Sequence, residues 1–124
     1  MVLDEETIKT LDERIKDIIV SLNELPFCET VSSCSGHPST DPAATPYVDI
    51  VYHDPKEAKR FHKALLKKVP YLDFRVLRGP RGESVHYIMD AEHTEEKMEK
   101  FWNGWREVLK EYRRIGKLKR SNRP

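Results

Sequence analysis

The strongest constraint on the fold is a set of large apolar residues near the C-terminal end of this 124-residue chain. They recur every three or four positions, as on one face of an α-helix, and are Met98, Phe101, Trp102, Trp105, Val108, Leu109 and Tyr112. Thr94 precedes this stripe and can cap the helix. Because such bulky side chains need an opposing apolar surface, we expect this helix to anchor the core.

Two more helices are predicted earlier in the chain. The first follows Asp4, a suitable N-cap, and must end before Pro26; its apolar positions are Ile8, Leu11, Ile15, Ile18, Ile19 and Leu22. The second starts at Asp54-Pro55-Lys56-Glu57, where an Asp cap precedes a proline at the first helical position. Its apolar stripe is Ala58, Phe61, Leu65 and Val69.

Four strands are predicted by runs of β-forming residues or by alternation of apolar side chains. The first run is Phe27 to Cys34, and the second is Tyr47 to Tyr52, which places Val48, Ile50 and Tyr52 on one face. The other two strands are expected to form a hairpin around the basic turn 78–83. Their apolar positions are Leu72, Phe74 and Val76 in one strand, and Val85, Tyr87 and Met89 in the other.

The predicted order of elements is α-β-β-α-β-β-α. This order favours an α+β fold, in which helices pack on one face of a four-stranded, mainly antiparallel sheet. We expect a single domain over residues 1–115. Beyond Ile115 the apolar periodicity stops, so residues 116–124 are expected to be a basic, mobile tail.

The charge of the whole chain gives little information about partners. Its 22 basic and 21 acidic residues nearly cancel, so no net field favours nucleic acid or a membrane, although acidic residues dominate 1–30 and basic residues 113–124. Two cysteines are too few for a disulfide framework and are expected to be reduced thiols. No segment approaches the about 18 apolar residues of a membrane span or begins like a signal peptide, so we expect the cytoplasm.

The main functional signal is the polar segment Ser32-Ser33-Cys34-Ser35-Gly36-His37. It ends the first strand and opens a proline-rich connection, and long connections of this kind are often functional. Main-chain amides around Ser35 and Gly36 could hold an anion, with the serine hydroxyls adding hydrogen bonds. Gly36 permits a positive φ. The alternative is a tight turn whose serines satisfy only local main-chain groups.

Other polar residues could complete a site beside this segment. Asp49 and Tyr47 lie on the opposite face of the second strand from its apolar residues, and Asp49 could orient an imidazole or receive a ligand amine. His86, which faces away from the apolar residues of its own strand, is a further candidate ligand-binding residue. Arg75, Arg78 and Arg81 could hold phosphates if they share a face with the serine segment. For each of these residues the alternative is a solvated side chain on a half-exposed strand or turn.

Cys34 and the histidines suggest two further kinds of site, a nucleophilic thiol and a zinc site. Cys34 could be a nucleophile if its surroundings favoured the thiolate, whereas Cys28 is expected to be a buried, inert thiol. Cys34 and His37 have a C-x-x-H spacing, and zinc binding would require His53 and His86 to converge on them. A second closely spaced ligand pair is missing from the sequence, so no metal is favoured.

The segment Val31-Ser32-Ser33-Cys34-Ser35-Gly36 resembles the S-S-C-S-G signature of the tRNA wybutosine-synthesising protein 3 family. Its members are methyltransferases that use S-adenosyl-L-methionine on a hypermodified guanosine beside the anticodon, and they lack the Rossmann glycine motif, as this chain does. The resemblance implies that Ser32, Ser33, Cys34, Ser35 and Gly36 belong to the site. Where the family usually has an arginine after the glycine, this sequence has His37, as in a group of small uncharacterised S-C-S-G-H proteins.

Two classes of function follow from the sequence. The first is a methyltransferase-like protein that binds a nucleotide-like ligand or a modified tRNA at Ser32–His37, with S-adenosyl-L-methionine as the implied cofactor. The second is a non-catalytic interaction domain that assembles through exposed strand edges or its basic tail and uses the serine segment only as a turn.

Overall fold

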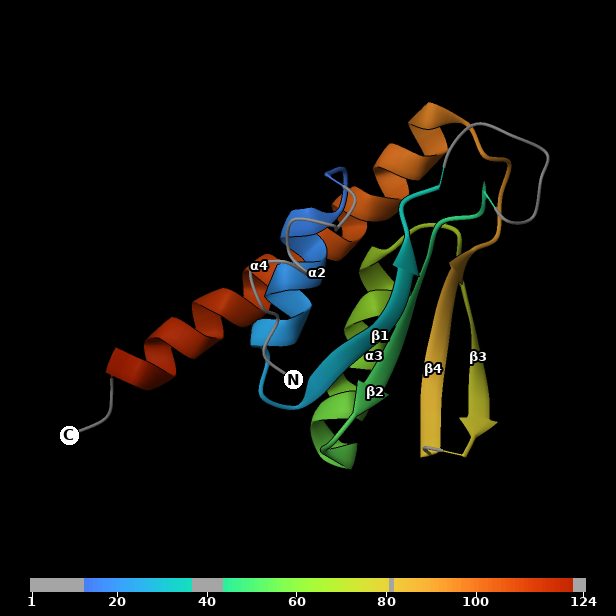
Figure 1. Cartoon of the computed structure of the whole chain (residues 1–124). Helices are drawn as coiled ribbons and strands as arrows, with labels where there is room; N and C mark the ends of the chain where they lie inside the picture. The colour runs from blue at the N-terminus through green and yellow to red at the C-terminus, as the bar shows by residue number, and fades with distance from the viewer. Residues whose placement is uncertain (1–12, 37–43, 81, 122–124) are drawn as a thin grey trace.

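The computed structural model describes residues 13–36, 44–80 and 82–121, and for 114–121 it describes the backbone alone. The described chain has three α-helices and four β-strands in the predicted order (Figure 1). They are α2 (Lys16–Glu24), β1 (Cys28–Cys34), β2 (Tyr47–Tyr52), α3 (Pro55–Lys68), β3 (Leu72–Gly79), β4 (Gly82–Met89) and α4 (Glu95–Ser121).

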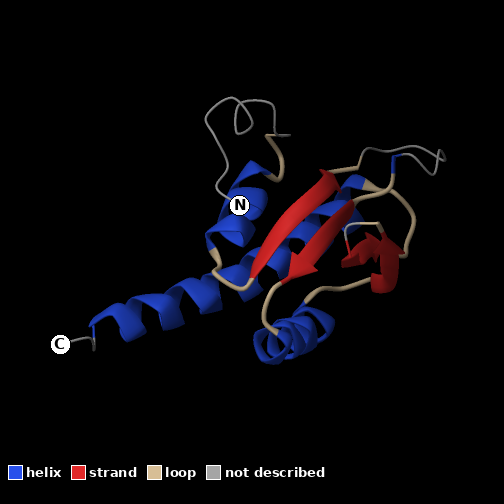
Figure 2. Cartoon of the chain, turned by 60° about the horizontal axis from the view of Figure 1, so that its bottom comes forward, coloured by secondary structure: helices blue, strands red, loops and turns tan. Residues whose placement is uncertain are grey.

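The four strands form one sheet in the spatial order β1-β2-β4-β3, and each neighbouring pair is antiparallel. All three helices lie on one face of this sheet, and the other face carries no helix of the described chain (Figures 1 and 2). The predicted α+β architecture is therefore confirmed. We call the uncovered side the open face.

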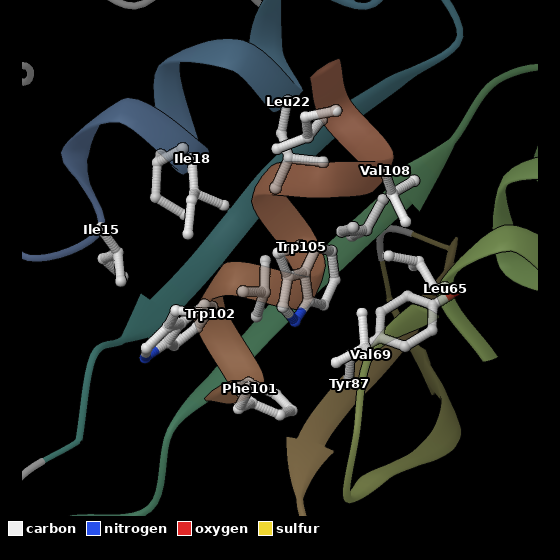
Figure 3. Close-up of a cluster of buried hydrophobic side chains, with 14 of the residues drawn as sticks. Ile15, Ile18, Leu22, Leu65, Val69, Tyr87, Phe101, Trp102, Trp105 and Val108 are labelled. Carbon is white, nitrogen blue, oxygen red and sulfur yellow. The ribbon is translucent and has the colours of Figure 1, made fainter. Parts of the chain in front are cut away.

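The core lies between the helices and the inner face of the sheet, and α4 supplies its largest side chains (Figure 3). Phe101, Trp102 and Trp105 are almost completely buried. On the sheet side, the residues predicted to share the apolar face do so, and Val48, Ile50, Tyr87 and Met89 are buried against the helices. The apolar stripe of α4 thus packs as its periodicity predicts.

Two predicted helix caps are confirmed by their hydrogen bonds. The Asp54 carboxylate accepts from the main-chain N–H groups of Lys56 at 3.0 Å and Glu57 at 3.3 Å. The Thr94 hydroxyl accepts from the N–H of Lys97 at 3.2 Å. These bonds satisfy amide groups that have no partner within the first turn of a helix.

The first helix begins later than predicted. Residues 13–15 form a turn, and the Ile15 backbone (φ −122°) is not helical. The prediction of a helix continuous from Asp4 to Leu22 is therefore wrong at this turn. At this turn the Arg14 carbonyl accepts a 2.6 Å hydrogen bond from the Arg106 side chain of α4, which is a tertiary contact. Asp4, with the first two apolar positions, lies outside the described residues.

The hairpin turn and the end of α4 also differ from expectation. β3 and β4 pair as far as Gly79 and Gly82, so the turn is shorter than the expected 78–83. Helix α4 continues to Ser121, past the point where its apolar periodicity stops. Mobility of the basic end stays a prediction. None of the described helices combines the length and apolar character needed to cross a membrane.

The helices cover β3 only poorly. Phe74 and Val76 point toward the helix side, as predicted, yet they are 38% and 50% exposed. In Figure 1 helix α3 lies behind β1 and β2, and α2 and α4 lie beside β1, while the β3–β4 hairpin extends beyond the helices. Side chains with the sequence character of core residues therefore remain in contact with solvent on this edge strand.

A chain of hydrogen bonds joins α3 to the inner face of the sheet. The hydroxyls of Tyr52 and Tyr87 are 2.7 Å apart, and the Tyr87 hydroxyl is 2.8 Å from Nδ1 of His62. Burial raises the pKa of both tyrosines and lowers the pKa of His62. The fold therefore favours the neutral imidazole, which can accept a hydrogen bond from the Tyr87 hydroxyl.

We predict that His62 makes the fold less stable in mild acid. Because its pKa in the folded chain is below the ordinary value of about 6.5, its contribution is complete above that pH and is lost as pH falls below it. Chemical denaturation at about pH 7 and about pH 5 measures this loss, and the loss should be smaller in His62→Gln. Equal losses in the two proteins would contradict the prediction.

Candidate functional site

The open face carries a row of four polar side chains, one from each strand. The strand register places Ser32 opposite Asp49, Asp49 opposite His86, and His86 opposite Arg75. Residues directly opposite each other in antiparallel strands share a face, so all four side chains project from the same side of the sheet. Together with Tyr47, we call these residues the open-face cluster.

Side-chain contacts connect the members of the open-face cluster. The Asp49 carboxylate accepts a hydrogen bond from Nδ1 of His86, and the two side chains are 17% and 22% exposed. The Tyr47 ring lies against the His86 ring with centroids 5.0 Å apart and planes inclined by 32°. The Tyr47 hydroxyl is 2.7 Å from the Ser32 hydroxyl. The cluster is thus a connected polar surface with two adjacent aromatic rings.

A β-bulge in β1 decides that Ser32 belongs to this cluster. Thr30 pairs with Ile50 and Ser32 pairs with Asp49, so Val31 is an extra residue in β1. Without the bulge, strict alternation from the buried Thr30 would turn Ser32 toward the helices. With it, Ser32 faces the open side and Val31 is exposed.

Asn23 of α2 fixes the strand beside the bulge. Its side-chain amide donates to the Thr30 hydroxyl at 2.8 Å, and its side-chain oxygen accepts from the Thr30 N–H at 3.1 Å. These two bonds hold the main chain and the side chain of Thr30 against α2. The sequence of β1 contains no pattern that predicts this contact with Asn23.

Ser35 and Gly36, by contrast, are committed to packing. The Ser35 carbonyl accepts a 2.9 Å hydrogen bond from the buried indole N–H of Trp102, and Ser35 is itself buried. Gly36 has a φ of +82°, as expected from the sequence. A Cβ atom on Gly36 would lie 2.5 Å from Pro46 Cγ, so this side of the residue has no free space.

The remaining residues of the serine segment do not act as one unit. Ser33 pairs with Val48 and faces the helix side, whereas Cys34 pairs with Tyr47 beside the open-face cluster. His37 lies outside the described residues. Among the described residues of the predicted serine-segment site, only Ser32 and Cys34 lie on the surface that also holds Asp49 and His86.

The predicted arginine group is also divided. Arg75 lies on the open face opposite His86, but Arg78 pairs with Glu83 on the other face of the sheet. The Arg78 Nε atom is 3.3 Å from a Glu83 carboxylate oxygen, an exposed ion pair at the hairpin. Arg81 is not among the described residues. Of the two described arginines, Arg75 is therefore the one that shares a face with Ser32.

The possible metal site does not assemble around His53. His53 follows the end of β2 that pairs with Cys28, whereas Cys34 is at the opposite end of β1, and the nearest acidic partner of His53 is Glu29 at 3.5 Å. Among the residues that the structure describes, no three metal-binding side chains gather. Burial raises the pKa of the Cys28 thiol to about 12, which suits an inert core thiol.

The open-face cluster has groups suited to a polar, planar ligand. Because Nδ1 of His86 donates to the Asp49 carboxylate, the second ring nitrogen, Nε2, is left to contact a ligand. The hydroxyls of Ser32 and Tyr47 can donate or accept, and Arg75 adds a positive charge at the edge of the row. Sequence reasoning placed Tyr47 on the face of Asp49 without assigning it to the site.

The chain was compared with models of protein families, with curated proteins and with solved structures, and nothing in these comparisons matches it.

We predict that Gly36→Ala destabilises the fold by at least about 2 kcal/mol, because it combines an unfavourable positive φ with a clash against Pro46. Gly79→Ala is the matched control: a Cβ there meets nothing within 4 Å. We expect that variant to change the free energy of unfolding by less than about 0.5 kcal/mol. Urea denaturation measures both values, and equal effects would argue against the packed role of Gly36.

Proposed function

We propose that this chain binds a nucleotide of single-stranded RNA on the open-face cluster, with tRNA as the substrate class. The observation that carries the proposal is the row Ser32, Asp49, His86 and Arg75, which crosses all four strands on the face that the described helices leave uncovered. The resemblance of Val31–Gly36 to the wybutosine-synthesising family is the reason for naming tRNA. The cytoplasm remains the expected compartment.

Uncovered four-stranded sheets suit single-stranded RNA because splayed bases can stack on their aromatic side chains while their edges are read by polar groups. Here Tyr47 and His86 provide two rings in contact, with centroids 5.0 Å apart and planes inclined by 32°, so they form one offset stack with an outer ring surface. A base can stack on this surface. The Asp49 carboxylate fixes the orientation of the imidazole before the ligand arrives.

The other members of the cluster match the remaining parts of a nucleotide. The hydroxyl of Ser32, which is already ordered by its contact with Tyr47, can bind a base edge or a ribose hydroxyl. Arg75 can bind a phosphate, because its guanidinium offers several donors in one plane. The negative charge of Asp49 faces His86, which lessens its repulsion of a phosphate.

The cofactor implied by the resemblance fits the described residues poorly. Two motif residues, Ser35 and Gly36, are buried against Trp102 and Pro46, and Ser33 faces the helix side. The motif therefore does not surround a ligand as one unit, and we derive no catalytic step through S-adenosyl-L-methionine. Methyl transfer stays a prediction of the resemblance. Calorimetric titration with this cofactor, with and without RNA, tests whether the chain binds it. No heat of binding in either titration would remove the cofactor from the proposal and leave only RNA binding.

We predict that a fluorescein-labelled RNA with the sequence of a tRNA anticodon loop binds the chain, and that Tyr47→Ala weakens this binding by about fivefold to about a hundredfold. The loss follows from removing a stacking surface, which is worth about 1–3 kcal/mol per base. Fluorescence anisotropy measures the dissociation constant. A fully paired RNA duplex of the same length should bind more weakly than the loop.

The matched pair Arg75→Ala and Arg78→Ala separates a specific contact from general charge. Both substitutions remove one positive charge from β3, but only Arg75 lies on the open face. Arg75→Ala should weaken binding and lower its dependence on salt, while Arg78→Ala should stay within about twofold of the wild type. Equal losses, or no RNA binding by the wild type, would overturn the proposed function.

A further inference from the structure

The outer edge of β3 has main-chain groups directed away from the sheet. Phe74 donates its N–H at 2.8 Å to the carboxylate of the neighbouring Asp73 instead of to β4. In an antiparallel ladder alternate residues point the same way, so the main-chain groups of Leu72 and Val76 are also directed outward. In the described sheet β3 pairs with β4 alone.

This edge also carries exposed apolar side chains on both of its faces. Phe74 and Val76 are exposed on the helix side, and Leu77 is 44% exposed on the open face. Monomeric proteins usually protect a long edge strand of this kind, because it can pair with another strand. Here the protection consists of Asp73 and Arg75, which lie two positions apart on the open face.

We propose that β3 pairs with β3 of a second copy of this chain, antiparallel, about a two-fold axis at Phe74. Residues opposite each other in an antiparallel pair share a face, and side chains alternate between the two faces along a strand. When β3 pairs with a second β3, the two-fold axis must therefore pass between the two copies of one residue. An axis at Asp73 or at Arg75 would place that charged residue opposite itself. An axis at Phe74 places Asp73 of each copy opposite Arg75 of the other copy, which gives two such pairs.

The same register matches the apolar face and the main chain. Leu72 of each copy lies opposite Val76 of the other copy, and the two Phe74 residues lie opposite each other at the axis. The outward N–H and C=O groups of these residues then bond to one another across the axis. The Asp73 carboxylate exchanges its bond with the Phe74 N–H for an ion pair with Arg75 of the second copy. Charge complementarity thus selects the occupant and the register together.

The expected assembly is a continuous eight-stranded sheet. Because the two-fold axis is perpendicular to the sheet, both open faces lie on one side and both helix layers on the other. This inference does not rest on RNA binding, and its test contains no RNA.

Analytical ultracentrifugation of the full chain tests the assembly through charge reversal. The wild type should sediment as a dimer. Asp73→Arg and Arg75→Asp should each weaken the dimer by at least about tenfold, because each replaces two attractive cross-strand pairs with two repulsive ones. The double variant should recover the dimer. Arg78→Asp has the same charge change as Arg75→Asp but is outside the charged pairs, so it should remain dimeric.

Thermal melting of each variant shows whether it is folded. A monomeric wild type, folded single variants that dimerise normally, or a folded double variant that stays monomeric would each overturn the proposal.

Disulfide trapping tests the register directly. In a Cys34→Ser background, Phe74→Cys should form a disulfide-linked dimer under mild oxidation, because the two residues at the axis are about 5.5 Å apart between Cα atoms. Leu77→Cys should remain monomeric on a denaturing gel, since the two copies of residue 77 are far from the axis. Crosslinking at 77 but not at 74 would reject this register.

Discussion

The placement of the helices on one face of a four-stranded sheet is the constraint on which the rest of this structure depends. Their apolar side chains fill the space over β1, β2 and β4, where Val48, Ile50 and Tyr87 are buried. The described helices leave the other face uncovered and cover β3 only poorly (Figures 1 and 2). Two surfaces remain available to other molecules as a result: the open face and the outer edge of β3.

These two surfaces differ in chemistry. The open face is polar and ordered by its own hydrogen bonds, since Asp49 orients His86 and Tyr47 contacts Ser32. Such preorganisation favours a small, polar, planar ligand, which has few contacts to offset its loss of freedom. The β3 edge instead offers main-chain groups, exposed apolar residues and alternating charges. This combination favours an extended strand. An RNA nucleotide and a second copy of the chain are therefore proposed for two different surfaces, which share Arg75.

The serine segment connects the core to the open face, and this connection explains its mixed composition. Trp102 of α4 holds the Ser35 carbonyl, and Gly36 allows the chain to pass close to Pro46. Ser32 reaches the open face only because Val31 forms a bulge beside Thr30, which Asn23 holds against α2. One short motif thus serves the packing of the fold at one end and a candidate site at the other.

The sequence by itself determined the order of the elements and the face that β2, β3 and β4 turn to the core. It could do so because apolar periodicity and helix caps, such as those at Asp54 and Thr94, act over a few neighbouring residues. It also identified Ser32, Asp49, His86 and Arg75 as candidates, but not that they form one row. That row depends on strand register, and the place of Ser32 in it depends on a bulge held by another element. The use of Ser35 and Gly36 in packing, and the exposure of Phe74, likewise depend on residues distant in the sequence. Only the tertiary structure could decide these points, because a local pattern carries no information about which distant group fills a given space.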